Sequence, residues 1–204
     1  ISFGMVLQDG KKMATRKGKT VKLQDVLEDA IELAEKYISE KNPNLDNKES
    51  ISKMIGVGAV IYNDLKNYRT NDIEFKLEDI LKFEGETAPY IQYTYARINS
   101  MLINKKNIDI NMNNIHINEY IWNIITQLIM FEEVLIKAKN SYDPSELAKY
   151  IMNIAQDYNK FYANEKVISD NIEETEFKLQ LSEAVTIVLK EGMRLLGIKM
   201  PKRM

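Results

Sequence analysis

Along most of this chain, apolar residues recur at three- and four-residue steps, the spacing that places side chains on one face of an α-helix. Residues 83–102 show the pattern most clearly, with one wholly apolar face and a neighbouring face that is half-polar. The first face consists of Ile91, Tyr95, Ile98 and Leu102, and the second of Tyr93, Ala96, Arg97 and Ser100. The pattern predicts a helix that packs through one face and can bind something through the other.

The ends of several helices carry their own signals. Thr87 is a good N-cap with Pro89 in the first turn behind it, and Asp143 followed by Pro144 repeats this arrangement. Gly197 follows an apolar-periodic segment and suits the left-handed position just past a helix C-terminus. The periodicity and these end signals predict helical or apolar core segments over residues 24–41, 47–68, 87–102, 117–139, 144–163 and 174–196.

Only the first residues of the chain show the alternation typical of a strand. Residues 1–9 alternate apolar and polar side chains, Gly10 permits a tight turn, and residues 20–23 resume an extended pattern. The segment between them, GKKMATRKGKT, is strongly basic. Such a loop can hold phosphate through backbone N–H groups and cationic side chains, although a solvated basic turn has the same composition.

Composition narrows the class of protein. With 204 residues, 45% hydrophobic content, 8 Gly and 4 Pro, the chain can bury one core and has too few breakers for an all-β protein. The 28 basic and 30 acidic residues give no overall attraction to a polyanion, so nucleic-acid contact requires a local patch and a DNA-coating role is not expected. The absence of Cys and of long apolar runs predicts a soluble cytoplasmic protein without a membrane partner. Because Ile1 opens within a predicted strand, we expect the chain to start inside a domain of a longer protein.

The residue inventory argues against several kinds of catalytic site. His116 is the single histidine, there is no cysteine, and no metal site or nucleophilic triad can be assembled from these. Gly56 and Gly58 form a GVGA sequence, but no strand precedes them and no GxGxxG motif is completed. We interpret these two glycines as sites of close helix packing.

Four segments resemble the arginyl branch of the class I aminoacyl-tRNA synthetases, and the resemblance covers nearly the whole chain. KMATR within DGKKMATRKGKTVKL is similar to the KMSKS loop, and EGETAPYIQYTYARINS is similar to the entry helix of the DALR anticodon-binding domain. DPSELAKYIMNIAQDYNKFY resembles the segment that gives that domain its name, and GMRLLGIKMPKRM resembles the family's C-terminus.

The resemblance implies an all-α helical bundle preceded by a short strand-loop remnant of the nucleotide-binding catalytic domain. The implied organisation is the end of the catalytic domain over 1–45, a connecting helical region over 46–82 and the anticodon-binding bundle over 83–204. The family commonly has a proline after the position of Phe131, where this chain has Glu132, so a weaker kink is expected. Residues 117–139, Trp122 included, are expected to lie in the core.

The KMSKS-like loop implies ATP chemistry in the full-length enzyme. Lys12 and Met13 match the signature, Ala14 replaces its serine, and Thr15 stands where the second lysine is usual. In the family this loop stabilises the pyrophosphate of ATP while the carboxylate of arginine attacks the α-phosphorus. The resemblance therefore implies an ATP-binding loop at residues 12–16, with ATP and Mg²⁺ as cofactors of the full-length enzyme.

Three basic residues could supply the catalytic charge, namely Lys12, Arg16 and Lys17, and the sequence leaves open which of them acts. The HIGH motif that completes the family's site is absent from the chain. We therefore expect the isolated fragment to be inactive and to hold no cofactor.

The same resemblance implies an anticodon site. Tyr93, Tyr158, Tyr162 and Met204 match positions that contact anticodon bases, and Gln92 and Arg97 are polar neighbours. Aromatic planes and polar side chains are what recognition of unstacked bases requires. For Tyr158 and Tyr162 the periodicity leaves two interpretations open, because they continue the stripe of Ile151 and Ala155 and could belong to the rim of the core.

The function implied is that of the C-terminal tRNA-binding part of an arginine–tRNA ligase, which joins arginine to tRNA-Arg through arginyl-adenylate. The expected partner is tRNA-Arg, with arginine and ATP as partners of the full-length enzyme alone, and the protein is expected to be a monomer. Two alternatives remain at this point. One is a helical protein-interaction module that has lost tRNA binding, and the other is a different class I synthetase of related architecture.

Overall fold

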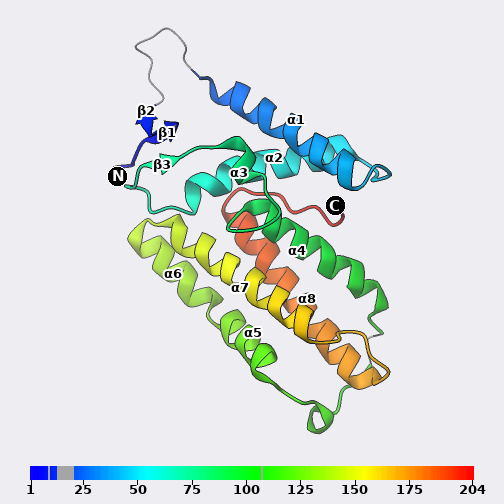
Figure 1. Cartoon of the computed structure of the whole chain (residues 1–204). Coiled ribbons are helices and arrows are strands. Elements are labelled where there is room, and N and C mark those ends of the chain that lie inside the picture. The colour runs from blue at the N-terminus through cyan, green and yellow to red at the C-terminus, as the bar shows by residue number, and fades with distance from the viewer. Residues whose placement is uncertain (9, 13–20, 107) are drawn as a thin grey trace.

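A computed structural model describes residues 1–8, 10–12, 21–106 and 108–204, and helices dominate it (Figure 1). The α-helices are α1 (Leu23–Lys41), α2 (Lys48–Leu65), α3 (Leu77–Ile80), α4 (Ala88–Met101), α5 (Glu119–Ile129), α6 (Phe131–Ser141), α7 (Pro144–Asn164) and α8 (Ile172–Leu195). The strands are β1 (Val6–Gln8), β2 (Lys11–Lys12) and β3 (Ile73–Glu74), and two short 3-10 turns lie at Leu102–Asn104 and Met112–Asn114. The predicted helical bundle with a short strand remnant is confirmed. Across the described residues, no helix combines the length and the apolar character needed to cross a membrane.

The main core lies where α4, α5, α7 and α8 pack together, with α7 in contact with each of the other three (Figure 1). Ile91 and Ile98 of α4, Ile151 and Phe161 of α7 and Leu189 of α8 are fully buried there. Burying one such side chain contributes about 1.5 to 3 kcal/mol. This core fixes α4 and α7 side by side, and the half-polar face predicted for α4 remains on the outside.

Helices α1 and α2 form a hairpin that approaches the bundle through α2. Gly56 permits the close approach of α1, because a Cβ atom there would lie 2.7 Å from the backbone carbonyl of Ala30. At Gly58 an added Cβ would lie 2.9 Å from Ile198 and 3.1 Å from Gln92. The interpretation of both glycines as sites of close packing is confirmed.

The small sheet has the order β2-β1-β3, with an antiparallel β1–β2 pair and a parallel β1–β3 pair. The strand predicted over residues 1–9 is therefore observed in its second half. The prediction of an extended segment at 20–23 is wrong at Leu23, because α1 begins there. Its N-cap, Lys22, has an extended backbone. Leu23 and Val26 are spaced for a helical face, and that face continues through Ala30.

The apolar segment predicted over 117–139 is divided into α5 and α6 at Met130. Met130 donates its N–H to the carbonyl of Gln127, which tightens the last turn of α5 without any proline. The helix is therefore interrupted here without a proline, and the expectation of a weaker kink than the family's stays a prediction. Trp122 is 59% exposed, and the prediction that it lies in the core is wrong, because α7 covers only the face of α5 that carries Ile121 and Ile124.

The chain leaves α8 through a tight reversal at Gly197, as predicted. Gly197 has φ +80°, its N–H bonds the carbonyl of Arg194, and the N–H of Ile198 bonds the carbonyl of Met193. These two bonds define a Schellman cap, which stops the helix and turns the chain aside. The final residues then run back past α4 toward the turn between α1 and α2 (Figure 1).

Candidate nucleic-acid interface

A cleft of about 1140 Å³ opens between the turn that joins α1 to α2, the outer face of α4, the end of α7 and the C-terminal tail. Its walls thus come from four segments that are distant in the sequence. Four of the six residues expected at an anticodon site line this cleft, namely Tyr93, Arg97, Tyr162 and Met204. The structure brings these four together, whereas Gln92 and Tyr158 lie elsewhere.

The half-polar face of α4 forms the floor of the cleft. All four residues of that predicted face, Tyr93, Ala96, Arg97 and Ser100, are among its lining residues. The register of α4 is set locally by Thr87, whose Oγ1 accepts the N–H of Tyr90 at 3.3 Å and donates to the carbonyl of Lys82 at 2.6 Å. The cap signal that could be seen in the sequence therefore fixes where α4 begins, and the burial of Ile91 and Ile98 in the core leaves the half-polar face toward the cleft.

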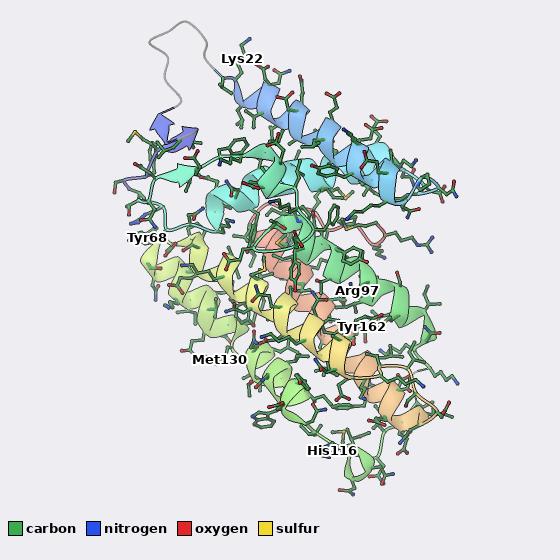
Figure 2. All side chains as sticks on the ribbon, in the orientation of Figure 1. Lys22, Tyr68, Arg97, His116, Met130 and Tyr162 are labelled. Atoms are coloured by element: carbon green, nitrogen blue, oxygen red, sulfur yellow. The ribbon has the colours of Figure 1, made fainter. Side chains whose placement is uncertain are left out.

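Arg97 lies against two exposed aromatic rings. Its Cζ is 4.8 Å from the ring centroid of Tyr93 on α4 and 4.9 Å from that of Tyr162 on α7. Figure 2 shows Arg97 and Tyr162 side by side between the two helices. Each cation–π contact at an exposed site is worth about 0.5 to 1 kcal/mol. The residues Tyr93 and Tyr162 remain 43% and 40% exposed, so each still offers surface to a ligand.

The ring of Tyr93 is also supported from below the cleft. Phe83 meets it edge to face at a centroid distance of 6.3 Å, and the ammonium of Lys41 lies 4.7 Å from the Phe83 centroid. These two contacts link α1 to the segment before α4, and that segment to α4 itself. Tyr93 is therefore an exposed side chain in a restricted position, which lowers the entropy lost when a planar ligand stacks on it.

Gln92 is fully buried and has a different task from the one expected of it. Its Nε2 donates to the carbonyl of Met54 on α2 at 3.1 Å and to the carbonyl of Lys199 in the tail at 2.8 Å. Gln92 thereby ties the tail to α2 and α4, and its side chain does not face the cleft. The periodicity of α4 gave no signal for this role, because Gln92 belongs to neither of the two faces predicted for the helix.

Tyr158 is buried in the core with 0% exposure. Its hydroxyl lies 2.9 Å from Oγ of Ser182, and because Ser182 donates to the carbonyl of Lys178 at 2.6 Å, Tyr158 is the donor of this pair. Burial raises the pKa of Tyr158 to about 12. Of the two interpretations left open for these tyrosines, the core applies to Tyr158, and Tyr162 lies on the rim of the cleft.

The cleft is locally basic although the whole chain has a formal net charge of −2. Arg97, Lys202 and Arg203 line it together with a single acidic residue, Asp46. Side-chain amides add neutral donors and acceptors around these charges, from Asn42, Asn44, Asn47 and Asn104. A patch of this kind is what a chain without overall positive charge needs in order to bind a polyanion.

The loop expected to bind ATP lies mostly outside the described residues. Lys12 is in β2, where its backbone pairs with that of Leu7, and its side chain is not described. Met13, Ala14, Thr15, Arg16 and Lys17 all fall outside the described ranges. The roles predicted for this loop therefore stay predictions. His116 is exposed at the far end of the bundle from the cleft (Figure 2).

Two family models match the chain. A DALR anticodon-binding domain matches residues 91–204, and the class I tRNA synthetase catalytic domain of the arginine type matches residues 1–77. The first match covers α4 from its first turn to the C-terminal tail, and so includes three of the four segments that form the cleft.

Curated relatives and solved structures agree with these models. The chain is 49% identical over its full length to arginine–tRNA ligase 1 of Bacillus cereus (strain ZK / E33L), and 48% identical to arginine–tRNA ligase of Exiguobacterium sibiricum. It spans 36% of the length of each of these relatives. Among solved structures, Thermus thermophilus arginyl-tRNA synthetase superposes with a TM-score of 0.91 at 28% identity, over 99% of this chain and 35% of that one. Arginyl-tRNA synthetase from Plasmodium falciparum gives 0.81 at 26% identity, over 100% and 35% respectively.

Proposed function

The chain belongs to the arginyl-tRNA synthetases and carries their DALR anticodon-binding domain, and from this premise we propose that its cleft binds the anticodon loop of tRNA-Arg. The observation that carries the proposal is the position of Arg97 against the exposed rings of Tyr93 and Tyr162 in a locally basic cleft. A family match alone does not supply that observation, because it depends on the geometry of this chain.

The chemistry of the cleft suits a single-stranded RNA loop. Unstacked bases bind by stacking on aromatic or guanidinium planes and by hydrogen bonds along their edges. Tyr93, Tyr162 and Arg97 supply such planes, and Lys202 and Arg203 supply charge for the phosphates. An apolar protein partner would make little use of these groups, so the geometry favours RNA over a protein-interaction module.

For the whole ligase, we propose the reaction of its relatives, in which arginine is joined to tRNA-Arg through an arginyl-adenylate made from ATP. Lys12, Arg16 and Lys17 remain the proposed sources of charge for the pyrophosphate, with Mg²⁺ as the proposed metal ion. We further propose that the enzyme works as a monomer in the cytoplasm. What supports the proposed reaction is the match of residues 1–77 to the arginine-type catalytic domain.

The proposal is tested by removing the two exposed rings in the protein that contains this chain. Tyr93→Ala and Tyr162→Ala should each weaken binding of tRNA-Arg by about 1 to 3 kcal/mol, the range for one base stacked on one aromatic side chain. The corresponding Phe variants keep the ring and should bind nearly as well as the wild type. Fluorescence or filter-binding titration measures these differences.

Tyr158→Phe serves as the matched control, because it alters a tyrosine of the same helix that lies outside the cleft. A second comparison uses tRNA-Arg with a replaced anticodon loop, to which the wild type should bind more weakly. Unchanged affinity in both Ala variants, or equal binding of the two tRNAs, would contradict an anticodon site at this cleft.

A further inference from the structure

A short series of hydrogen bonds runs behind Arg97, away from the cleft. Thr94 Oγ1 donates to the carbonyl of Tyr90 at 2.9 Å, Asn159 Nδ2 donates to Thr94 Oγ1 at 2.8 Å, and Arg97 Nη1 donates to Asn159 Oδ1 at 2.7 Å. We propose that Asn159 is a positioning residue for RNA binding, which holds the Arg97 guanidinium against its two tyrosines and is itself oriented by Thr94. This inference rests on the proposed function of the cleft.

The direction of every bond in the series follows from the first one. A threonine hydroxyl has one hydrogen, and Thr94 directs it to the carbonyl of Tyr90, so its oxygen can only accept from a second partner. The Asn159 amide must therefore present its NH₂ group to Thr94. Its carbonyl oxygen is then left facing Arg97.

That orientation matters because a guanidinium group has donors and no acceptor. If the amide of Asn159 were reversed, its NH₂ group would face Arg97, and two donors would meet without a bond. Thr94 prevents this reversal. The hydroxyl of a buried threonine thus determines whether Arg97 finds an acceptor on α7.

Neither supporting residue belongs to the lining of the cleft. Thr94 is 0% exposed, Asn159 is half-buried, and neither lines the cleft, whereas Arg97 does. Asn159 engages one nitrogen of the guanidinium, and within the described residues no other hydrogen bond to that group is seen. The donors on the remaining nitrogens can meet acceptors on a base edge or a phosphate. Any effect of Thr94 or Asn159 on RNA binding should therefore pass through Arg97.

The first test is a double-mutant cycle for tRNA-Arg binding in the protein that contains this chain. Asn159→Ala should weaken binding roughly 3- to 10-fold, in keeping with the loss of one hydrogen bond that restrains a charged group. In an Arg97→Ala background the same change should have almost no effect. Equal losses in the two backgrounds would overturn the proposal, because a merely structural role of Asn159 does not require Arg97.

Thr94 supplies a matched pair of variants for the second step. Thr94→Val keeps the shape of the side chain and removes the hydroxyl, so it should reproduce the loss seen with Asn159→Ala. Thr94→Ser keeps the hydroxyl and should bind tRNA like the wild type. Identical affinity of the Val and Ser variants would overturn the role assigned to Thr94.

A readout without RNA separates this inference from the proposed function. In protein labelled with ¹⁵N-arginine, the Arg97 guanidinium should show slowed rotation and a ring-current shift from its tyrosines. Both features should be lost in Asn159→Ala and Thr94→Val and retained in Thr94→Ser. If the variants lose both features as expected but the wild type does not distinguish anticodons, only the proposed function is contradicted. If both features persist in Asn159→Ala, the positioning role is overturned.

Discussion

Tyr158 and Tyr162 show how far a residue's role depends on its neighbours in space. They stand four residues apart on α7, which places them on nearly the same face, with an offset of about 40°. Tyr158 is covered by α8 and finds Ser182, whereas Tyr162 lies near the end of α7 and faces the cleft. The periodicity placed both tyrosines on the same stripe of the helix. It could not show that α8, which is distant in the sequence, covers only Tyr158.

The burial of Tyr158 predicts a dependence of stability on alkaline pH. Below pH 10 the phenol is neutral in both the folded and the unfolded protein, since 10.0 is its ordinary pKa. Burial raises the pKa of Tyr158 to about 12 in the folded protein, so between these values only the unfolded chain loses the proton. The contribution of Tyr158 is thus complete below pH 10, and the free energy of unfolding should fall as pH rises from 10 to 12.

Urea unfolding at a series of pH values between 8 and 11.5 measures this slope. Tyr158→Phe should fall less steeply than the wild type, although it starts lower by about 1 kcal/mol because the bond to Ser182 is lost. The slope should not vanish, since burial also raises the pKa of Tyr150 to about 12 and raises the pKa of Tyr62. Tyr162→Phe, which alters an exposed ring, is the control. Parallel slopes for Tyr158→Phe and the wild type would contradict the prediction.

At the scale of elements, helix ends were predicted well where the signal is local. Thr87 and Asp143 cap α4 and α7 through their own side chains, and Gly197 ends α8, all within a few residues of the signal. The division of α5 from α6 at Met130 was predicted only as a weakened kink, because a tightened turn without proline leaves no mark in composition. The ends of a helix can therefore be predicted from the sequence where a capping residue or a glycine marks them.

Gly197 allows a prediction that separates stability from RNA binding. Gly197 and Gly85 both have positive φ, +80° and +74°, and an added Cβ would meet nothing within 4 Å at either position. Gly→Ala at each should cost about 1 to 2 kcal/mol of backbone strain. For a chain of this size, that lowers the melting temperature by roughly 2 to 8 °C.

The two variants should differ in tRNA binding. Gly197 directs the tail that forms one wall of the cleft, so Gly197→Ala should also weaken tRNA-Arg binding, whereas Gly85→Ala should leave the affinity of the folded protein nearly unchanged. Thermal unfolding and a binding titration on the same preparations give both quantities. Equal affinities for the two variants would show that the position of the tail does not matter for RNA.

At the scale of the whole molecule, the cleft could not be derived from periodicity. Its lining comes from residues 42–54, 93–104, 162 and 200–204, and only the tertiary arrangement brings these segments together. Family resemblance supplied Tyr93, Tyr162 and Met204 as single positions, without the contacts among them. It also proposed Gln92 as a neighbour of the bases, where the structure shows a buried amide that holds the tail.

The contrast between a basic cleft and an acidic chain predicts where salt dependence originates. If Lys202 and Arg203 contact phosphates, replacing both by Ala should make the slope of log K against log salt shallower by about 1.4, at roughly 0.7 for each single-strand phosphate. Replacing Lys190 and Arg194 of α8 by Ala removes the same charge outside the lining of the cleft and should leave the slope unchanged. Titrations between 50 and 200 mM salt, a range in which such effects are large, measure both slopes. Equal changes in the two double variants would mean that net charge, and not the cleft, attracts the RNA.

The missing side chain of Gly58 has a consequence beyond the packing of α2. Because Gln92 and Ile198 occupy the space where a Cβ would lie, one added methyl group would push on both the amide that holds the tail and the first residues of the tail itself. A substitution at Gly58 should therefore displace the tail that forms one wall of the cleft, although Gly58 itself does not line it. If the cleft binds an anticodon loop as proposed, a side chain at this position should weaken RNA binding as well as the fold, although the position lies outside the lining of the cleft.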